Sequence, residues 1–354
     1  MTASGLDEQK RWASWTLLFI DRVPLPYRLT VALATMVLLV EQVMEDSFSD
    51  PGLGQLLTPA GLSARLAIPL VFLYAMTMVK VLRGTALTEL GDLQPAVQLS
   101  TAEYDDYVRK MVGTSQRTQS FIGLASVAIV ILLWGIVGLP LPVNANTYLP
   151  QNTVVAVFIL ACYVLFAWGA LTLVFVTFQF GVSLGALARC PLAINIFDSE
   201  NLLPFGRLSV VNSLSTAGVI VILLIFLGPP VTSLAWSVVI LASVASLMAL
   251  LLPLWGVHQQ MSHAKTQALV QLHQQFKECQ SLLLHSSDAA IGQLGAISDQ
   301  IETLTRLRKM VMGAPSWPFR DFGAIVKALV AAMSPLVYVV ITEAIRAYLK
   351  NFIR

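Results

Sequence analysis

The chain has 354 residues, of which 56% are hydrophobic and only 12% are charged, and its formal net charge is +2 at pH 7. Water-soluble domains carry about 25% charged residues, so this composition excludes an ordinary soluble fold. The small net charge provides no field that would attract nucleic acid. No Asp, Glu, Lys or Arg occurs between Arg117 and Arg189 or between Arg207 and Lys265. Such runs predict an integral membrane protein whose surface contacts the lipid bilayer.

The apolar segments predict a polytopic helix bundle. A bilayer core about 30 Å thick needs about 20 apolar residues in a helix. We expect residues 1–28 to form a cytoplasmic N-terminus with an interfacial helix at 11–20, and residues 29–256 to form a six-helix membrane domain. The six spans are expected at about 29–46, 64–82, 120–139, 153–180, 208–228 and 233–256. A last unit at 317–354 adds a membrane helix at 322–342, so the expected fold is an all-α bundle of about seven transmembrane helices with long cytoplasmic helical extensions.

The basic residues are gathered on one side of this topology. Eighteen of the 22 Lys and Arg residues lie in the segments 1–28, 80–117, 181–207 and 257–327, whereas the loops on the opposite side contain none. Because Lys and Arg accumulate in cytoplasmic loops, we expect the N-terminus to be cytoplasmic. The side of the C-terminus stays open, since the segment 322–342 could cross the membrane or lie in the interface.

Two helical elements are expected in water on the cytoplasmic side. Residues 100–103, Ser-Thr-Ala-Glu, have the capping-box pattern and predict a short helix at 101–112. The segment 257–316 contains two heptad seams, which predict two helices folded as a hairpin, assembled between subunits or packed onto the membrane domain. The seam positions are Leu269, Leu272, Phe276, Cys279 and Leu283, then Ala290, Leu294, Ile297, Ile301 and Leu304. Leu294, Ile297 and Ile301 are the candidate contact for a cytoplasmic partner.

The sequence contains no recognisable catalytic motif. It has no phosphate-binding loop, dinucleotide fingerprint, nucleophile elbow or CxxC pair, and its spans lack mid-membrane acids and bases. The four histidines have spacings that scatter them around a helix, so we expect solvated positions. We therefore expect no enzyme, no catalytic residue, no cofactor and no metal site.

The loop before the fifth span and the start of that span carry further polar residues. Asp198 and Glu200 are the candidates for binding a ligand or a cation, and the alternative is that the loop packs on the membrane surface with its acids solvated. One of the polar side chains at 212–216 is expected to bond a neighbouring helix.

The last membrane segment carries a polar stripe. Small and polar residues recur there at intervals of three or four, on a helix whose other face is aliphatic; the candidates for lining a pore are Lys327, Ala331, Ser334, Tyr338 and Thr342. A water-filled path shared by subunits and a packed contact inside the bundle both fit this stripe. Pro335 is expected to kink the helix.

Three motifs resemble a family of bacterial multi-pass membrane proteins with no assigned activity. They are Phe197-Asp198 followed by 203–209 (Leu-Pro-Phe-Gly-Arg-Leu-Ser), 252–258 (Leu-Pro-Leu-Trp-Gly-Val-His) with Lys265, and 316–319 (Ser-Trp-Pro-Phe). The resemblance covers about 190–350 and implies a bacterial inner (plasma) membrane. The layout alone is similar to that of the seven-helix insect chemoreceptor channels.

These observations leave three hypotheses for function. The first is a homo-oligomeric channel in which the last helix lines the path. The second is a non-catalytic sensor or scaffold that acts through its cytoplasmic helices. The third is a transporter of a neutral substrate, for which no inverted repeat is visible.

Overall fold

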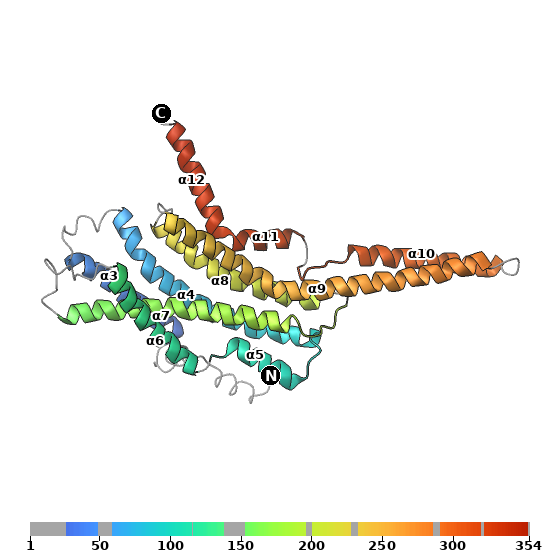
Figure 1. Ribbon diagram of the computed structural model, residues 1–354, viewed down its shortest axis with the longest axis horizontal. Coiled ribbons are helices and arrows are strands. Elements are labelled where there is room, and N and C mark those ends of the chain that lie inside the picture. The colour runs from blue at the N-terminus through green and yellow to red at the C-terminus, as the bar shows by residue number, and fades with distance from the viewer. Residues whose placement is uncertain are drawn as a thin grey trace.

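Helices make up most of the part of the chain that the computed structural model describes, which is residues 26–48, 59–114, 116–137, 153–195, 200–227, 233–285, 291–319 and 322–352. The other described residues form turns and short extended segments, which include an isolated antiparallel bridge between Val97 and Leu192. The helices are α3 (Tyr27–Phe48), α4 (Pro59–Leu93), η1 (Gln94–Ala96), α5 (Thr101–Val112), α6 (Gln116–Val137), α7 (Thr153–Leu187), η2 (Glu200–Leu202), α8 (Leu203–Leu227), α9 (Ser233–His285), α10 (Ile291–Gly313), α11 (Phe322–Ala332) and α12 (Ser334–Phe352) (Figure 1). The expected all-α class is confirmed.

Five helices in the described ranges are long and apolar enough to cross a membrane, and a sixth span results if the bent pair α11–α12 is counted as one. The five segments are Tyr27–Met44, Arg65–Ala96, Val157–Leu187, Glu200–Ile225 and Val239–Leu282. Each of them overlaps one of the expected spans. The span expected at 120–139 falls on α6, which is not among the five, so the count of seven stays a prediction. The interfacial helix expected at 11–20 lies outside the described residues.

The centre of the bundle is formed by α4, α7, α8 and the first half of α9, which pack against one another, while α3 and α6 pack on its outside (Figure 1). The helices α4 and α8 approach closely where a Cβ atom at Gly218 would collide with Tyr74. The hydroxyl of Tyr74 donates a hydrogen bond to the carbonyl oxygen of Leu214 at 2.7 Å. Gly218 therefore leaves room for the Tyr74 side chain between the two helices.

A buried serine pair joins α8 to α9. The Ser213 hydroxyl lies 2.9 Å from the Ser246 hydroxyl, and each hydroxyl also contacts the other residue's backbone carbonyl, at 2.9 and 3.0 Å. Both side chains are fully buried. This pair confirms the expected polar contact between the start of the fifth span and a neighbouring helix.

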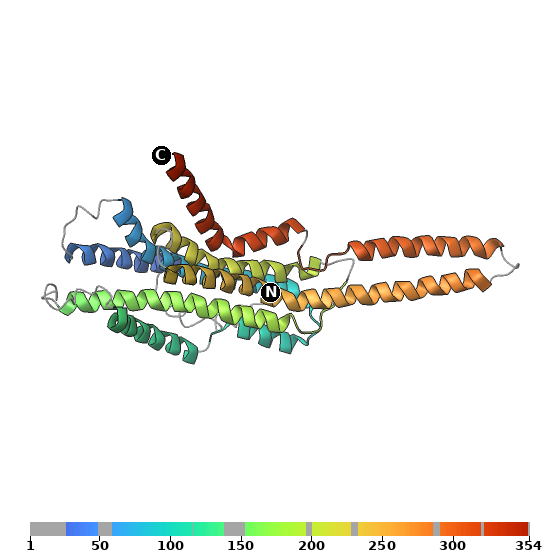
Figure 2. The same ribbon diagram turned by 45° about the horizontal axis from the view of Figure 1, so that its top comes forward.

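The longest helix carries the fold out of the bundle. The 53 residues of α9 correspond to about 80 Å at 1.5 Å per residue, and its second half pairs with α10 in a hairpin that projects beyond the other helices (Figures 1 and 2). The seam residues Cys279 and Leu304 are buried within it. The hairpin is therefore formed within one chain, and the domain boundary expected at 256/257 falls inside an unbroken helix.

The short helix α5 begins at the predicted capping box. The amide of Glu103 donates to the Ser100 hydroxyl oxygen at 3.3 Å, and the amide of Ser100 donates to the Glu103 carboxylate at 3.1 Å. The Ser100 hydroxyl also donates to the Glu103 carboxylate, at 2.7 Å. This bond, together with the one from the Ser100 amide, favours the ionised carboxylate and lowers the pKa of Glu103. The capping box is therefore complete at neutral pH and weakens when acid protonates Glu103.

We expect Ser100→Ala to destabilise α5 by about 1 kcal/mol, because the amide of Glu103 loses its acceptor. Hydrogen exchange of the first-turn amides should be faster in this variant, and the Glu103 pKa should rise towards its ordinary value. Thr101→Ala, one residue along and also exposed, is the control. Equal exchange rates in the two variants would contradict the prediction.

Candidate functional site

A large cavity lies where α4, α8 and α11 meet. It has a volume of about 870 Å³ and opens to the outside of the molecule. We call it the junction cavity. Four charged residues line it: Glu89 from α4, Glu200 from η2, Arg207 from α8 and Lys327 from α11. Most of the remaining wall is apolar, formed by Leu203, Val210, Val211, Pro318, Phe319, Ala324, Ala328 and Ala331, with Gly206 and Thr85.

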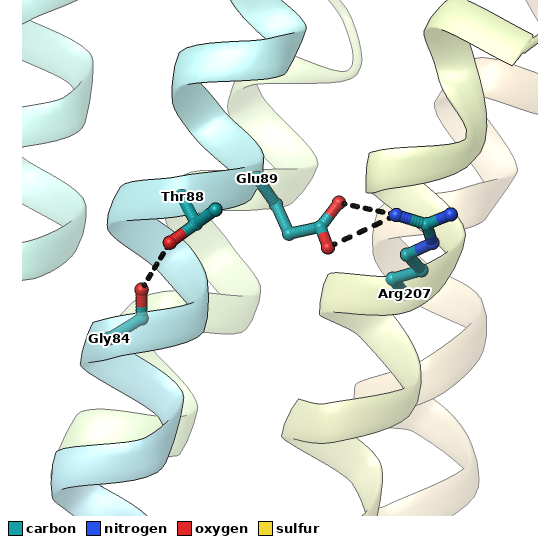
Figure 3. A network of polar contacts seen from close by, with 4 residues as sticks. All are labelled: Gly84, Thr88, Glu89 and Arg207. Atoms are coloured by element: carbon teal, nitrogen blue, oxygen red, sulfur yellow. Dashed lines mark hydrogen bonds and ion pairs between the residues drawn. The ribbon is translucent and has the colours of Figure 1, made fainter.

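An ion pair crosses the cavity wall from α4 to α8. One terminal nitrogen of Arg207 lies 3.3 and 3.5 Å from the two carboxylate oxygens of Glu89. The side chain of Glu89 is 14% exposed and that of Arg207 is 61% exposed. Figure 3 shows the second terminal nitrogen of Arg207 pointing away from Glu89, while Thr88 turns aside to bond Gly84. Because Arg207 is largely exposed, the pair contributes little to stability, and the guanidinium keeps donors for another acceptor.

The third wall of the cavity carries a lysine. Lys327 is exposed, and it makes no hydrogen bond or ion pair with any residue that the structure describes. Ala328 and Ala331 lie beside it on the same wall. An exposed ammonium group with no acceptor among the described residues is available to a ligand.

The segment 314–319, which we call the junction segment, closes one end of the cavity. It reaches α8 because Gly206 has no side chain: a Cβ atom there would collide with the carbonyl oxygen of Pro318 and lie 3.1 and 3.2 Å from ring carbons of Phe319. Gly206 is buried by this contact. Gly206 therefore sets how closely the junction segment, which follows the α9–α10 hairpin, packs against α8.

A histidine on α9 holds the other side of the junction segment. The ring of His258 stacks on Trp317 with the ring centroids 4.3 Å apart and the planes 19° from parallel. Its Nδ1 donates to the carbonyl oxygen of Ser316 at 2.7 Å, because a carbonyl only accepts. The expected solvated position is wrong for His258, since the half-buried ring packs on this segment.

A lysine on α9 caps the end of α10. The Lys265 ammonium donates to the carbonyl oxygens of Met312 at 2.8 Å and Ala314 at 2.9 Å. A cation at the C-terminal end of a helix satisfies carbonyls that have no partner inside the helix. Lys265 therefore fixes where α10 ends and the junction segment begins.

We expect Lys265→Met to loosen the end of α10 by about 1.5 kcal/mol, since two charge-assisted hydrogen bonds are lost while the aliphatic stem is kept. Hydrogen exchange across the end of α10 and the junction segment should become faster. Lys277→Met, on the exposed surface of the same helix, should leave this exchange unchanged. The prediction fails if the two variants exchange alike.

A glutamine next to this region ties α9 to the turn after α7. The side-chain nitrogen of Gln260 donates to the carbonyl oxygens of Ala188 at 2.9 Å and Cys190 at 2.8 Å. Its side-chain oxygen accepts from the amide of Leu192 at 3.2 Å. One side chain thus satisfies three backbone groups of a turn.

The structure divides the stripe of candidate pore residues. Lys327 and Ala331 line the junction cavity on α11, whereas Ser334, Tyr338 and Thr342 belong to α12, which bends away by 75°. Tyr338 packs beside Leu224 and Val239, and the Thr342 hydroxyl donates to the Tyr338 carbonyl oxygen at 2.8 Å. The kink expected at Pro335 is present as a 75° bend between α11 and α12. The five candidate pore residues therefore do not form one straight stripe.

The other candidates fall in different places. Glu200 lines the junction cavity, and Asp198 lies outside the described residues. Ile297 and Ile301 are half-buried on the helix that packs against α9, which makes them part of the hairpin seam. The backbone of Leu294 lies in α10.

Sequence reasoning missed the Glu89–Arg207 pair and the role of Gln260. A weak signal for Arg207 was its position as the last charge before a long uncharged run. Glu89 and Gln260 carry no local signal, because their partners are 118 and about 70 residues away.

Among the described residues, no group of three or more His, Cys, Asp or Glu side chains could hold a metal ion. Comparison of the chain with known protein families, curated proteins and solved structures found no match.

Proposed function

We propose that the chain is a homo-oligomeric channel, or a channel-like protein, of a bacterial inner membrane, and that its last helix lines the path. The observation that carries this proposal is the break between α11 and α12. The 11 residues of α11 cover about 16 Å at 1.5 Å per residue, about half of a bilayer core. The chain then turns by 75° into α12, which leaves its own bundle (Figures 1 and 2).

The surface of α12 supports a partner made of protein. Val339 is buried against α8 and α9, but the aliphatic residues on the other side are 37–57% exposed; they are Val337, Val340, Ile341 and Ile345. The helix also contains Glu343, Arg346 and Lys350. We propose that a second copy of the chain covers this exposed apolar side of α12.

The polar residues of α12 then supply the path. Ser334, Tyr338 and Thr342 recur every four residues and therefore share one face of the helix. Hydroxyl groups on a face between subunits can replace part of the hydration of a passing ion or polar solute. Lys327 and Ala331, on α11, would line the approach to this path from the junction cavity.

Purified protein in proteoliposomes tests the proposal. We expect ion flux in a verified oligomer, and we expect Thr342→Val to change its rate or selectivity. Thr303→Val on α10 is a matched control, because the hydroxyl of Thr303 likewise donates to the carbonyl four residues earlier, at 2.9 Å. The lack of flux across ions and voltages, or an equal effect of both substitutions, would overturn the proposal.

A second candidate function is favoured by the unbroken helix α9. One rigid element joins the membrane bundle to the α9–α10 hairpin, which suits a sensor or scaffold that transmits a membrane state to a cytoplasmic partner. Polar substitutions at Leu294, Ile297 and Ile301 should then abolish co-purification of that partner, whereas the channel proposal requires no partner other than a second copy.

A further inference from the structure

The junction cavity presents cationic donors on two of its walls. Arg207 uses one terminal nitrogen for Glu89 and turns the other away from it (Figure 3), and Lys327 has no acceptor among the described residues. Arginine and lysine together bind phosphate oxygens well, the guanidinium through paired donors and the ammonium as a point charge. The two groups therefore favour an anionic phosphoester as the ligand.

Apolar residues follow both cations along α8 and α11, and Leu203 and Ala324 precede them by one turn. Both α8 and α11 begin at this end of the bundle and run away from it (Figure 1). Val210 and Val211 therefore lie one turn deeper than Arg207, and Ala331 lies one turn deeper than Lys327. A ligand that fits this order has a charged end at the water boundary and an apolar end directed into the bilayer.

We propose that the junction cavity binds an anionic phospholipid, with its headgroup phosphate between Lys327 and Arg207 and the start of an acyl chain along α8 and α11. Basic pockets between membrane helices on the cytoplasmic side are suited to such headgroups. This site goes beyond the proposed channel function and does not depend on it. It places a membrane lipid in contact with the junction segment and with the last membrane segment.

The two carboxylates of the cavity fit this assignment differently. Glu89 is largely buried and paired with Arg207, so it orients the guanidinium. Glu200 is exposed on the wall of the cavity and adds a negative charge near the phosphate. Removing the charge of Glu200 should therefore strengthen binding of an anionic lipid, whereas it would weaken binding of a cation.

The test uses the full chain in phosphatidylcholine nanodiscs, titrated with dioctanoyl phosphatidylglycerol and followed by native mass spectrometry. We expect one lipid per chain, and about five-fold weaker binding for Lys327→Gln, since one basic residue at a lipid surface contributes on the order of 1 kcal/mol. Lys327→Arg should keep the affinity. Lys277→Gln, on the exposed hairpin surface, is the matched control and should bind as the unsubstituted chain does.

Three results would overturn the proposal. The first is equal affinity for dioctanoyl phosphatidylglycerol and dioctanoyl phosphatidylcholine, or no binding of the former. The second is unchanged affinity in Lys327→Gln. The third is binding of glycerol phosphate as tight as that of the lipid, which would identify a soluble phosphoester as the ligand. Should Lys327→Gln fail to fold, Glu200→Gln decides the matter: tighter lipid binding supports the site, and unchanged or weaker binding refutes it.

Discussion

Replacing Gly206 by alanine should destabilise the protein by about 3 kcal/mol, the upper end of the cost of overpacking a filled site. The added Cβ would meet the carbonyl oxygen of Pro318 as well as the ring of Phe319. A ring can rotate away, but a backbone oxygen moves only if the junction segment moves with it. We therefore expect Gly206→Ala to push this segment off α8 and to enlarge the opening of the junction cavity.

Thermal unfolding in detergent measures the loss of stability, and limited proteolysis between α10 and α11 measures the displacement of the segment. Gly84→Ala and Gly91→Ala on α4 are the controls, because a Cβ atom at either position meets nothing within 4 Å. These two variants should be neutral or slightly stabilised, as alanine is the better helix former. Phe319→Ala should not rescue Gly206→Ala, since it leaves the Pro318 oxygen in place. Full rescue, or an unfolding temperature equal to that of the α4 controls, would refute the argument.

Features encoded within a few residues were predictable from the sequence. The helix 101–112 was predicted at its correct bounds because Ser100 and Glu103 satisfy each other's backbone amides locally. The hairpin seam was predictable because buried positions such as Cys279 and Leu304 follow the helical repeat. Both signals depend on periodicity and capping, which do not require knowledge of a distant partner.

The candidate site depends on contacts that no local pattern encodes. The three sequence motifs 203–209, 252–258 with Lys265, and 316–319 meet at the junction. Gly206 belongs to the first, His258 and Lys265 to the second, and Trp317 to the third. Their order in the chain gives no hint that they touch.

The break after α11 was only partly predictable from the sequence. Pro335, in the first turn of α12, cannot donate to the preceding turn, but the 75° angle depends on how α11 and α12 pack on α8 and α9.

Gln260→Leu should cost about 3 kcal/mol, because it leaves backbone groups of a packed turn without hydrogen bonds, at about 1–3 kcal/mol for each buried group. Ala188 is fully buried and Leu192 is 8% exposed, so water cannot freely replace the lost amide. The turn after α7 also pairs with the segment that follows α4 and η1, through the bridge from Val97 to Leu192. A leucine at position 260 has no polar group with which to hold this turn. We therefore expect the substitution to loosen the contacts that this turn makes with α9 and with the chain that follows α4.

Thermal unfolding of the purified protein checks this prediction, with Gln259→Leu as the matched control. Gln259 is the preceding residue on the same helix and is exposed, so the two variants share composition and helix propensity and differ in the three hydrogen bonds. We expect Gln260→Leu to unfold several degrees below Gln259→Leu, with faster hydrogen exchange at the Leu192 amide. Equal unfolding temperatures would contradict the prediction. They would mean that apolar contacts hold the turn and that the hydrogen bonds of Gln260 add no stability.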